Sequence, residues 1–178
     1  MTISRWAGCV ASFALALTAA CTSATPDTSA NADIKANADL RLADRDAIQA
    51  TLDRYIRGLD RLDAPTYLSA WAADGEVSLY GEDVHRGHDA LAEYIVTEKA
   101  ARVAAQEKGE GFVQFHQLYN QRIEFTGADT AEHRAYWTAS RRDAKGKIEV
   151  AFIGRLVDQF VLRDGAWLLQ RREVLSDP

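Results

Sequence analysis

The feature that most constrains the fold is a change in sequence pattern at Phe112. Before this residue, apolar side chains recur at helical spacing. After it, long segments rich in Val, Ile, Phe, Tyr and Trp follow one another, separated by short turns that contain Gly or Asp and are typical of hairpins. The segments expected to form strands are 112–126, 131–142, 148–163 and 167–175. Helices followed by consecutive hairpins predict an α+β fold, with the helices packed on one face of a curled antiparallel sheet.

The half of the domain before Phe112 is expected to be mainly helical. Apolar residues recur there at spacings of three and four, which predicts one buried face on each longer helix. Pro65 favours the start of a short second helix, because proline suits the first helical turn. The expected elements are helices over 44–62, 66–73 and 88–106, a strand over 76–80 and a loop over 81–87.

The N-terminal segment 1–21 is predicted to be an export signal. A short apolar stretch, below the roughly 20 residues that span a membrane, ends in small residues directly before Cys21. The five residues 17–21 resemble a bacterial lipobox, apart from a Thr where Leu is usual, and this predicts lipidation of Cys21. Two alternatives stay open: ordinary cleavage after Ala20 or Ala24, and an uncleaved anchor.

Residues 22–39 are small and polar, with almost no large hydrophobic side chain. Such a segment buries too little apolar surface to offset its loss of conformational entropy, so a flexible tether is expected. The folded domain is then 40–178, long enough for one well-buried core. Together with the leader, this organisation predicts a domain in the bacterial cell envelope that contacts the membrane only through its lipid anchor.

Charge and cysteine content exclude several classes of function. The chain carries 26 acidic and 21 basic residues, for a formal charge of −5, which disfavours nucleic-acid binding. Its two cysteines, Cys9 and Cys21, both lie in the leader, so the domain has no thiol chemistry. His85 and His88 lack a convincingly placed third ligand, and no glycine-rich phosphate loop follows a strand. Neither a metal nor a cofactor is expected.

Several motifs occur in a characteristic order along the domain. They are Arg54–Asp63, Ala73-Asp74-Gly75, Phe115–Ile123 and Gly154–Phe160. In this order the chain resembles the SnoaL-like domains of the nuclear transport factor 2-like superfamily, whose members include scytalone dehydratase and bile-acid 7α-dehydratase. The resemblance implies a cone, in which a strongly bent sheet wraps around the N-terminal helices. It also implies a cofactor-free lyase. Because this fold often dimerises through its sheet, a homodimer is a further possibility.

The resemblance places a helix-borne acid at Asp60, a strand-borne base at His116 and pocket tyrosines at Tyr80 and Tyr55. Chemistry supports the first pair, because an inward carboxylate needs a partner and would fix the tautomer of a nearby imidazole. The alternatives are a solvated Asp60, a His116 satisfied within the core, and tyrosines that only pack. Two features of those dehydratases have no counterpart in this sequence. Their second acid–base or polar group would fall at 139–141, where no His or carboxylate stands, and the C-terminal arginine of the bile-acid enzyme has no convincing match.

Three further residues are candidates for substrate binding. Trp137 is expected in the pocket wall, and Asn120 shares a strand face with the expected base unless a β-bulge intervenes. Arg155 and Asp158 lie on opposite faces of their strand; one could enter the cavity, and alternation does not say which. The pair at 141–142 is expected to be solvated.

The sequence thus predicts a cofactor-free dehydratase or isomerase that acts by His/Asp acid–base catalysis on a small hydrophobic hydroxylated molecule. One alternative is a non-catalytic binding or carrier protein for an apolar small molecule at the cell envelope. Another is an assembly subunit that uses its sheet as an interface.

Overall fold

The computed structural model describes the backbone of residues 28–176. The predicted signal peptide with Cys21, and residues 22–27 of the predicted tether, lie outside the described residues. Over the described range, no helix combines the length and apolarity needed to cross a membrane.

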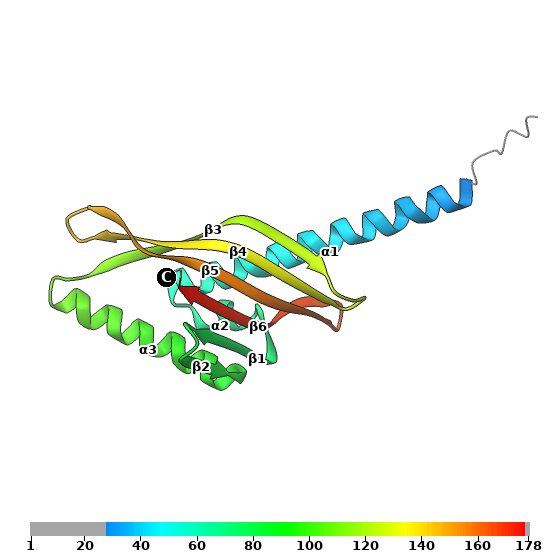
Figure 1. The fold of residues 1–178 in the computed structure, drawn as a ribbon. Helices are drawn as coiled ribbons and strands as arrows, with labels where there is room; N and C mark the ends of the chain where they lie inside the picture. Colours follow the sequence, from blue (N-terminus) through cyan, green and yellow to red (C-terminus); the bar gives the residue numbers. More distant parts are fainter. Residues whose placement is uncertain (1–27, 177–178) are drawn as a thin grey trace, which may run out of the picture.

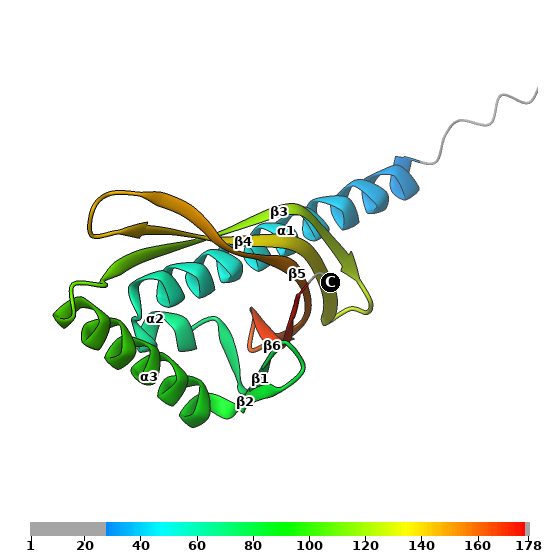
Figure 2. The ribbon, with the colours of Figure 1, turned by 60° about the vertical axis from the view of Figure 1, so that its left-hand side comes forward.

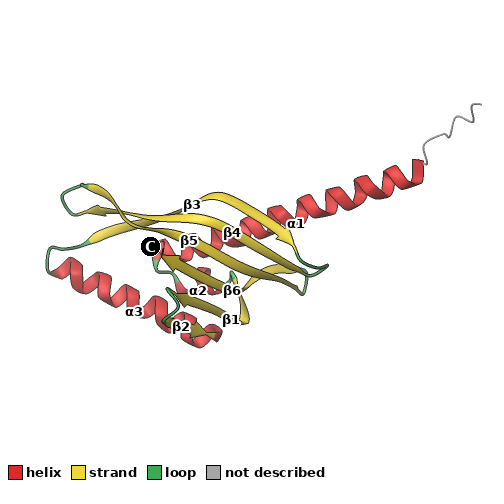
Figure 3. Ribbon diagram, in the orientation of Figure 1, coloured by secondary structure: helices red, strands yellow, loops and turns green. Residues whose placement is uncertain are grey.

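Within residues 28–176 the chain forms three helices and one six-stranded sheet (Figure 1, Figure 3). The helices are α1 (Thr28–Arg61), α2 (Ala64–Leu68) and α3 (Gly87–Glu107). The strands are β1 (Trp71–Leu79), β2 (Asp83–Arg86), β3 (Phe112–Phe125), β4 (Thr130–Asp143), β5 (Ile148–Arg163) and β6 (Ala166–Ser176). The sheet order is β2-β1-β6-β5-β4-β3, antiparallel except where β1 runs parallel to β6. The predicted α+β class is confirmed.

The sheet curves, and its concave face holds the core (Figure 2). The C-terminal half of α1 lies along this face, whereas its N-terminal half projects beyond the sheet. Ile48 and Leu52, one helical turn apart on α1, are fully buried in the core. The rings of Tyr55, Tyr67 and Trp71 pack together beneath them, with centroids 5.2 to 5.9 Å apart. These contacts fix α1 and α2 against β1.

One glycine sets the spacing between the first two helices. A Cβ at Gly58 would lie 2.4 Å from the backbone nitrogen of Tyr67, so only glycine allows α2 to pack this closely on α1. The short α2 begins after Asp63, with Pro65 in its first turn. The close contact brings the end of α1, including Asp60, to the inside of the molecule.

Two segments differ from the sequence prediction. The second helix ends at Leu68 instead of Ala73, because Trp71 starts β1, where it is 2% exposed and pairs with Leu169 of β6. The expected loop over 81–87 contains β2, which extends β1 by a short hairpin. Helix and strand propensities are close for such short segments, and pairing with the sheet decides between them.

The first helix also begins earlier than expected. It starts at Thr28, so residues 28–39 of the predicted tether are helical in the structure. Alanine recurs through this stretch and favours a helix even where few large apolar side chains are present.

Candidate active site

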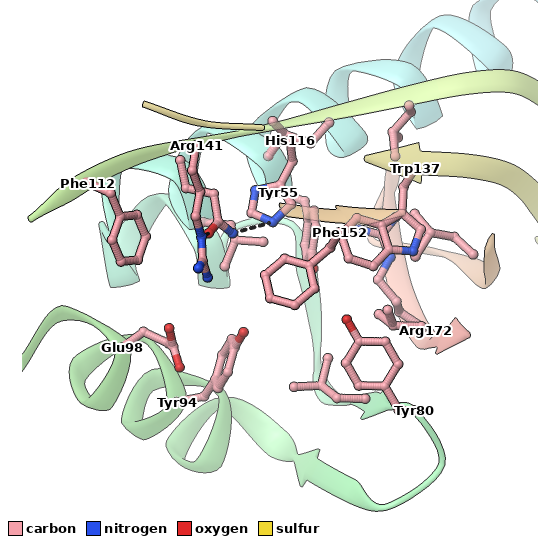
Figure 4. Close-up of a pocket in the computed structure, with 17 residues that line it drawn as sticks. Tyr55, Tyr80, Tyr94, Glu98, Phe112, His116, Trp137, Arg141, Phe152 and Arg172 are labelled. Carbon is pink, nitrogen blue, oxygen red and sulfur yellow. Dashed lines mark hydrogen bonds between the residues drawn. The ribbon is translucent and has the colours of Figure 1, made fainter. Parts of the chain in front are cut away.

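A cavity of about 290 Å³ opens between α1, α3 and the concave face of the sheet. Its walls combine aromatic and aliphatic side chains with a few polar groups, as is typical of small-molecule sites. Figure 4 shows these side chains converging from the helices and the strands. The labelled lining residues are Tyr55, Tyr80, Tyr94, Glu98, Phe112, His116, Trp137, Arg141, Phe152 and Arg172.

Asp60 and His116 meet at the wall of this cavity. Asp60 lies in the last turn of α1, and His116 lies on β3 where the sheet passes over that turn. The Asp60 carboxylate accepts a hydrogen bond from the His116 backbone N–H at 3.1 Å, and its Oδ1 lies 2.6 Å from Nδ1 of the ring. Their side chains are 17% and 14% exposed. Two contacts from one carboxylate hold both the ring and the strand in place.

The hydrogen-bond network assigns the tautomer of His116. The carboxylate of Asp60 can only accept, so Nδ1 of His116 carries the hydrogen. Nε2 lies 3.1 Å from the amide nitrogen of Gln114, whose Oε1 accepts from Nε of Arg141 at 2.9 Å. Because Arg141 fixes the orientation of the amide, Gln114 donates to Nε2. In this arrangement Nε2 accepts, and it lies on the side of Gln114 and the cavity.

An aromatic stack supports the imidazole. The ring of Trp137 lies 6.0 Å from the ring of His116, at an interplanar angle of 30°. Phe152 continues the stack on the other side of Trp137, with centroids 6.4 Å apart. Trp137 lines the cavity as the sequence predicts, and its Nε1 is buried without a hydrogen-bond partner among the described residues.

Tyrosine hydroxyls line the side of the cavity opposite the imidazole. Tyr80 directly follows β1, in the left-handed region with φ of 58°, and is half-exposed in the turn to β2. Burial raises the pKa of Tyr80, and also that of Tyr94 on α3, so both phenols stay protonated at neutral pH and can donate. Tyr55 is buried and also lines the cavity. The structure thus brings His116, Tyr80 and Tyr55 to one cavity, and Asp60 reaches it through its contact with His116.

Arg172 on β6 is a cavity residue that the sequence did not indicate. It is fully buried, and its guanidinium lies over the Tyr55 ring at 3.9 Å. Nε and Nη2 donate to the two oxygens of Asp158 at 2.6 and 2.7 Å. The remaining nitrogen, Nη1, finds no partner within the described part of the chain. Nη1 is thus a charged donor that is buried beside the cavity without a hydrogen-bond partner among the described residues, which costs free energy.

Asp158 holds Arg172 with the help of His133. Nδ1 of His133 lies 2.7 Å from Oδ2 of Asp158, and all three side chains are fully buried. Burial alone would raise the pKa of Asp158, but the charge and hydrogen bonds of Arg172, together with the bond from His133, outweigh it and lower the pKa. Asp158 is therefore an anion that orients Arg172.

A β-bulge explains why Arg172 was missed. Gln159 pairs with Arg171 and Phe160 with Leu169, which leaves Gln170 as an extra residue on β6. Strict alternation from Leu169 would turn Arg172 away from the core. The extra residue reverses the faces, so Arg172 points inward.

Two predicted substrate-binding residues lie outside the cavity. Asn120 forms part of a bulge in β3, with φ of 51°, and is exposed, so the shared face with His116 is lost. Arg155 is exposed on the outer face of β5, and its alternative, Asp158, is the inward residue. Arg141, expected in a solvated pair, lines the cavity instead.

The sequence profile of the SnoaL-like domain matches residues 40–173. The chain belongs to the SnoaL-like domain family. No curated protein matches it significantly. Within the described range, no three His, Cys, Asp or Glu side chains gather as a candidate metal site.

Solved structures share the fold of this SnoaL-like protein. An NTF2-like protein with a cystatin-like fold from Novosphingobium aromaticivorans is 25% identical, with a TM-score of 0.65 over 79% of this chain and 86% of its own. The hexachlorocyclohexane dehydrochlorinase LinA-type3 from Novosphingobium barchaimii is 20% identical, with a TM-score of 0.62 over 79% and 91%. A candidate scytalone dehydratase from N. aromaticivorans is 22% identical, with a TM-score of 0.61 over 79% and 89%. Distant structural relatives therefore include lyases.

Proposed function

We propose that this SnoaL-like protein is a cofactor-free lyase that removes water from a small apolar hydroxylated molecule, or a related isomerase. The observation that carries the proposal is the 2.6 Å contact between Asp60 and Nδ1 of His116 at the wall of an apolar cavity. The contact leaves Nε2 as the basic nitrogen on the cavity side. A positioned imidazole of this kind acts as a general base and then as a general acid.

In the proposed reaction, Nε2 of His116 takes a proton from a substrate carbon, and the amide of Gln114 gives way to the substrate. The electrons of the broken C–H bond form the new C=C bond as the C–O bond to the hydroxyl group breaks. The imidazolium returns its proton to the departing oxygen, which leaves as water. Asp60 stabilises the imidazolium while it carries the proton.

Negative charge develops on a substrate oxygen during this step. Nη1 of Arg172, like Nε1 of Trp137, is a buried donor of a cavity residue that lacks a partner among the described residues, and the protonated hydroxyl of Tyr80 belongs to the same cavity. Donors that are already oriented stabilise such charge without reorganisation. We assign Arg172 and Tyr80 to this role.

The test uses a β-hydroxy ketone that fits the cavity, the aldol adduct of benzaldehyde and acetone, whose dehydration gives a strongly absorbing enone. Asp60→Asn and His116→Ala should each lower turnover by about 10²- to 10⁴-fold while the unfolding midpoint changes little. Asp53→Asn is the matched control, because Asp53 lies on the exposed face of the same helix. Unchanged turnover in correctly folded His116→Ala would refute the assignment of the base.

A non-catalytic binding or carrier protein is the second candidate function. The observation that favours it is the contact of Nε2 of His116 with the Gln114 amide, which occupies the lone pair that a base needs. A protein of this type would bind the β-hydroxy ketone and its enone product without interconverting them. Deuterium exchange at the substrate carbon next to the ketone, followed by NMR in D₂O, separates the two functions, since only the enzyme catalyses it.

We also propose that the domain functions in the bacterial cell envelope, held by a lipid on Cys21. The support for this is the apolar leader that ends in a lipobox-like sequence. Metabolic labelling with a palmitate analogue in the native host would detect the lipid, and Cys21→Ser should abolish the label.

A further inference from the structure

Arg141 has no task in the proposed reaction, although it lies at the cavity. Its guanidinium lies between two aromatic rings, 4.3 Å from the centroid of Phe112 and 4.9 Å from that of Phe152 (Figure 4). Nε donates to Oε1 of Gln114 at 2.9 Å. Stacking on both sides and a hydrogen bond at the base hold the planar group in one orientation. The structure therefore presents a preformed guanidinium fork at one end of the cavity.

The two terminal nitrogens of this fork lack an anionic partner. No carboxylate of residues 41–175 lies within 4.0 Å of Arg141. The charges near Arg102 are Glu98, one turn away on α3, Asp60 at the end of α1, and Arg141 itself. Burial lowers the pKa of Arg102, and Glu98 is the main group that opposes this effect. Two arginines and two carboxylates therefore lie in this region, but Asp60 is already held by His116, and Arg141 has no carboxylate partner within residues 41–175.

We propose that Arg141 binds a carboxylate of the substrate, so that the substrate class is a small apolar organic acid. A guanidinium with two free N–H groups matches a carboxylate in geometry and charge. The cavity volume of about 290 Å³ corresponds to about ten water volumes, and thus to a ligand of about that many non-hydrogen atoms. Such a ligand places its carboxylate on Arg141 and its apolar body along Phe152 and Trp137.

The proposal rests on the proposed function, because it names the substrate class of the same site. Arg141 and His116 both contact the side chain of Gln114. The rings of Phe112 and Phe152 hold Arg141 and Asp60 holds His116 independently of that amide, so a carboxylate bound by Arg141 stands at a fixed separation from the base. This arrangement makes Arg141 a determinant of both affinity and position.

Isothermal titration calorimetry with hydrocinnamate and hydrocinnamamide tests the proposal at neutral pH. The two probes have the same shape, and only hydrocinnamate is charged. The wild-type protein should bind hydrocinnamate at least about tenfold more tightly, which corresponds to about 1.4 kcal/mol. Arg141→Met should bind both probes equally. Arg142→Met is the matched control, because Arg142 is exposed and does not line this cavity, and it should keep the preference.

Two further measurements separate the possible failures. The indole N–H resonance of Trp137 should shift on titration, which places the probe in the cavity. Arg141→Gln repeats the loss of charge with a polar side chain, in case Arg141→Met does not fold. Equal binding of both probes by the wild-type protein, or a preference that survives in both Arg141 variants, would overturn the carboxylate site. His116→Ala should retain the preference, so loss of the lyase assignment leaves this test intact.

Discussion

Asp158→Asn tests whether the buried ion pair with Arg172 holds the fold around the cavity. The substitution keeps the shape of the side chain but removes the charge that accepts two bonds from Arg172, at 2.6 and 2.7 Å, and one contact from His133, at 2.7 Å. All three side chains are fully buried, so water cannot replace the lost charge. Breaking one partner of such a pair costs about 3–5 kcal/mol of unfolding free energy.

Urea unfolding followed by Trp fluorescence measures this cost. With an m-value of about 2 kcal/mol/M, the midpoint should fall by roughly 2 M, and the melting temperature by roughly 10–15 °C. The double variant Asp158→Asn/Arg172→Met removes both charges, and it should lose less than the sum of the two single variants, by at least about 1 kcal/mol. A loss below about 1 kcal/mol in Asp158→Asn, or strict additivity, would refute the reasoning.

The pH dependence of stability supplies an independent check. The folded-state pKa of Asp158 lies below its ordinary value of 3.8. Its contribution is therefore fully present above about pH 4, and it is lost as the pH falls from there through the folded-state pKa. The stability gap between the wild type and Asp158→Asn should narrow on acidification below about pH 4.

Two other substitutions test the packing of α1 on α2 and the role of the Tyr80 hydroxyl. Gly58→Ala should lower the unfolding free energy by about 1–3 kcal/mol, because its Cβ would lie 2.4 Å from the backbone nitrogen of Tyr67. A melting temperature within about 1 °C of the wild type would contradict this. Tyr80→Phe should lower kcat for the β-hydroxy ketone by about tenfold or more with little change in stability, since it removes one donor from a half-exposed wall; an unchanged kcat would assign Tyr80 to packing.

Much of the site could be predicted because it depends on local pattern. Asp60 stands at the edge of an apolar helix stripe, and His116 stands among apolar residues of a strand, so local pattern made each a candidate and the family resemblance gave both a catalytic role. Trp137 was expected in the pocket wall. The distance between the acid and the base could not be predicted, because it depends on where β3 crosses the end of α1.

Several site residues were misplaced because of strand irregularities. Asn120 and Arg172 lie at or just beyond β-bulges, and one extra residue exchanges the two faces of a strand. Arg141 was expected to be solvated, because it stands next to a second arginine near a predicted hairpin turn. Only the approach of Phe112 and Phe152 made it part of the cavity wall.

The sequence by itself determined the α+β class and the order of helices and hairpins, since periodicity and turn residues act over short stretches of chain, and its family resemblance indicated the acid and the base. The tertiary structure decided which side chains share one cavity, the inward turn of Arg172 and the unpaired charge of Arg141. These features arise from contacts between strands and helices far apart in the chain. A bulge of one residue leaves almost no trace in the composition, yet it exchanges the inward and outward faces of a strand.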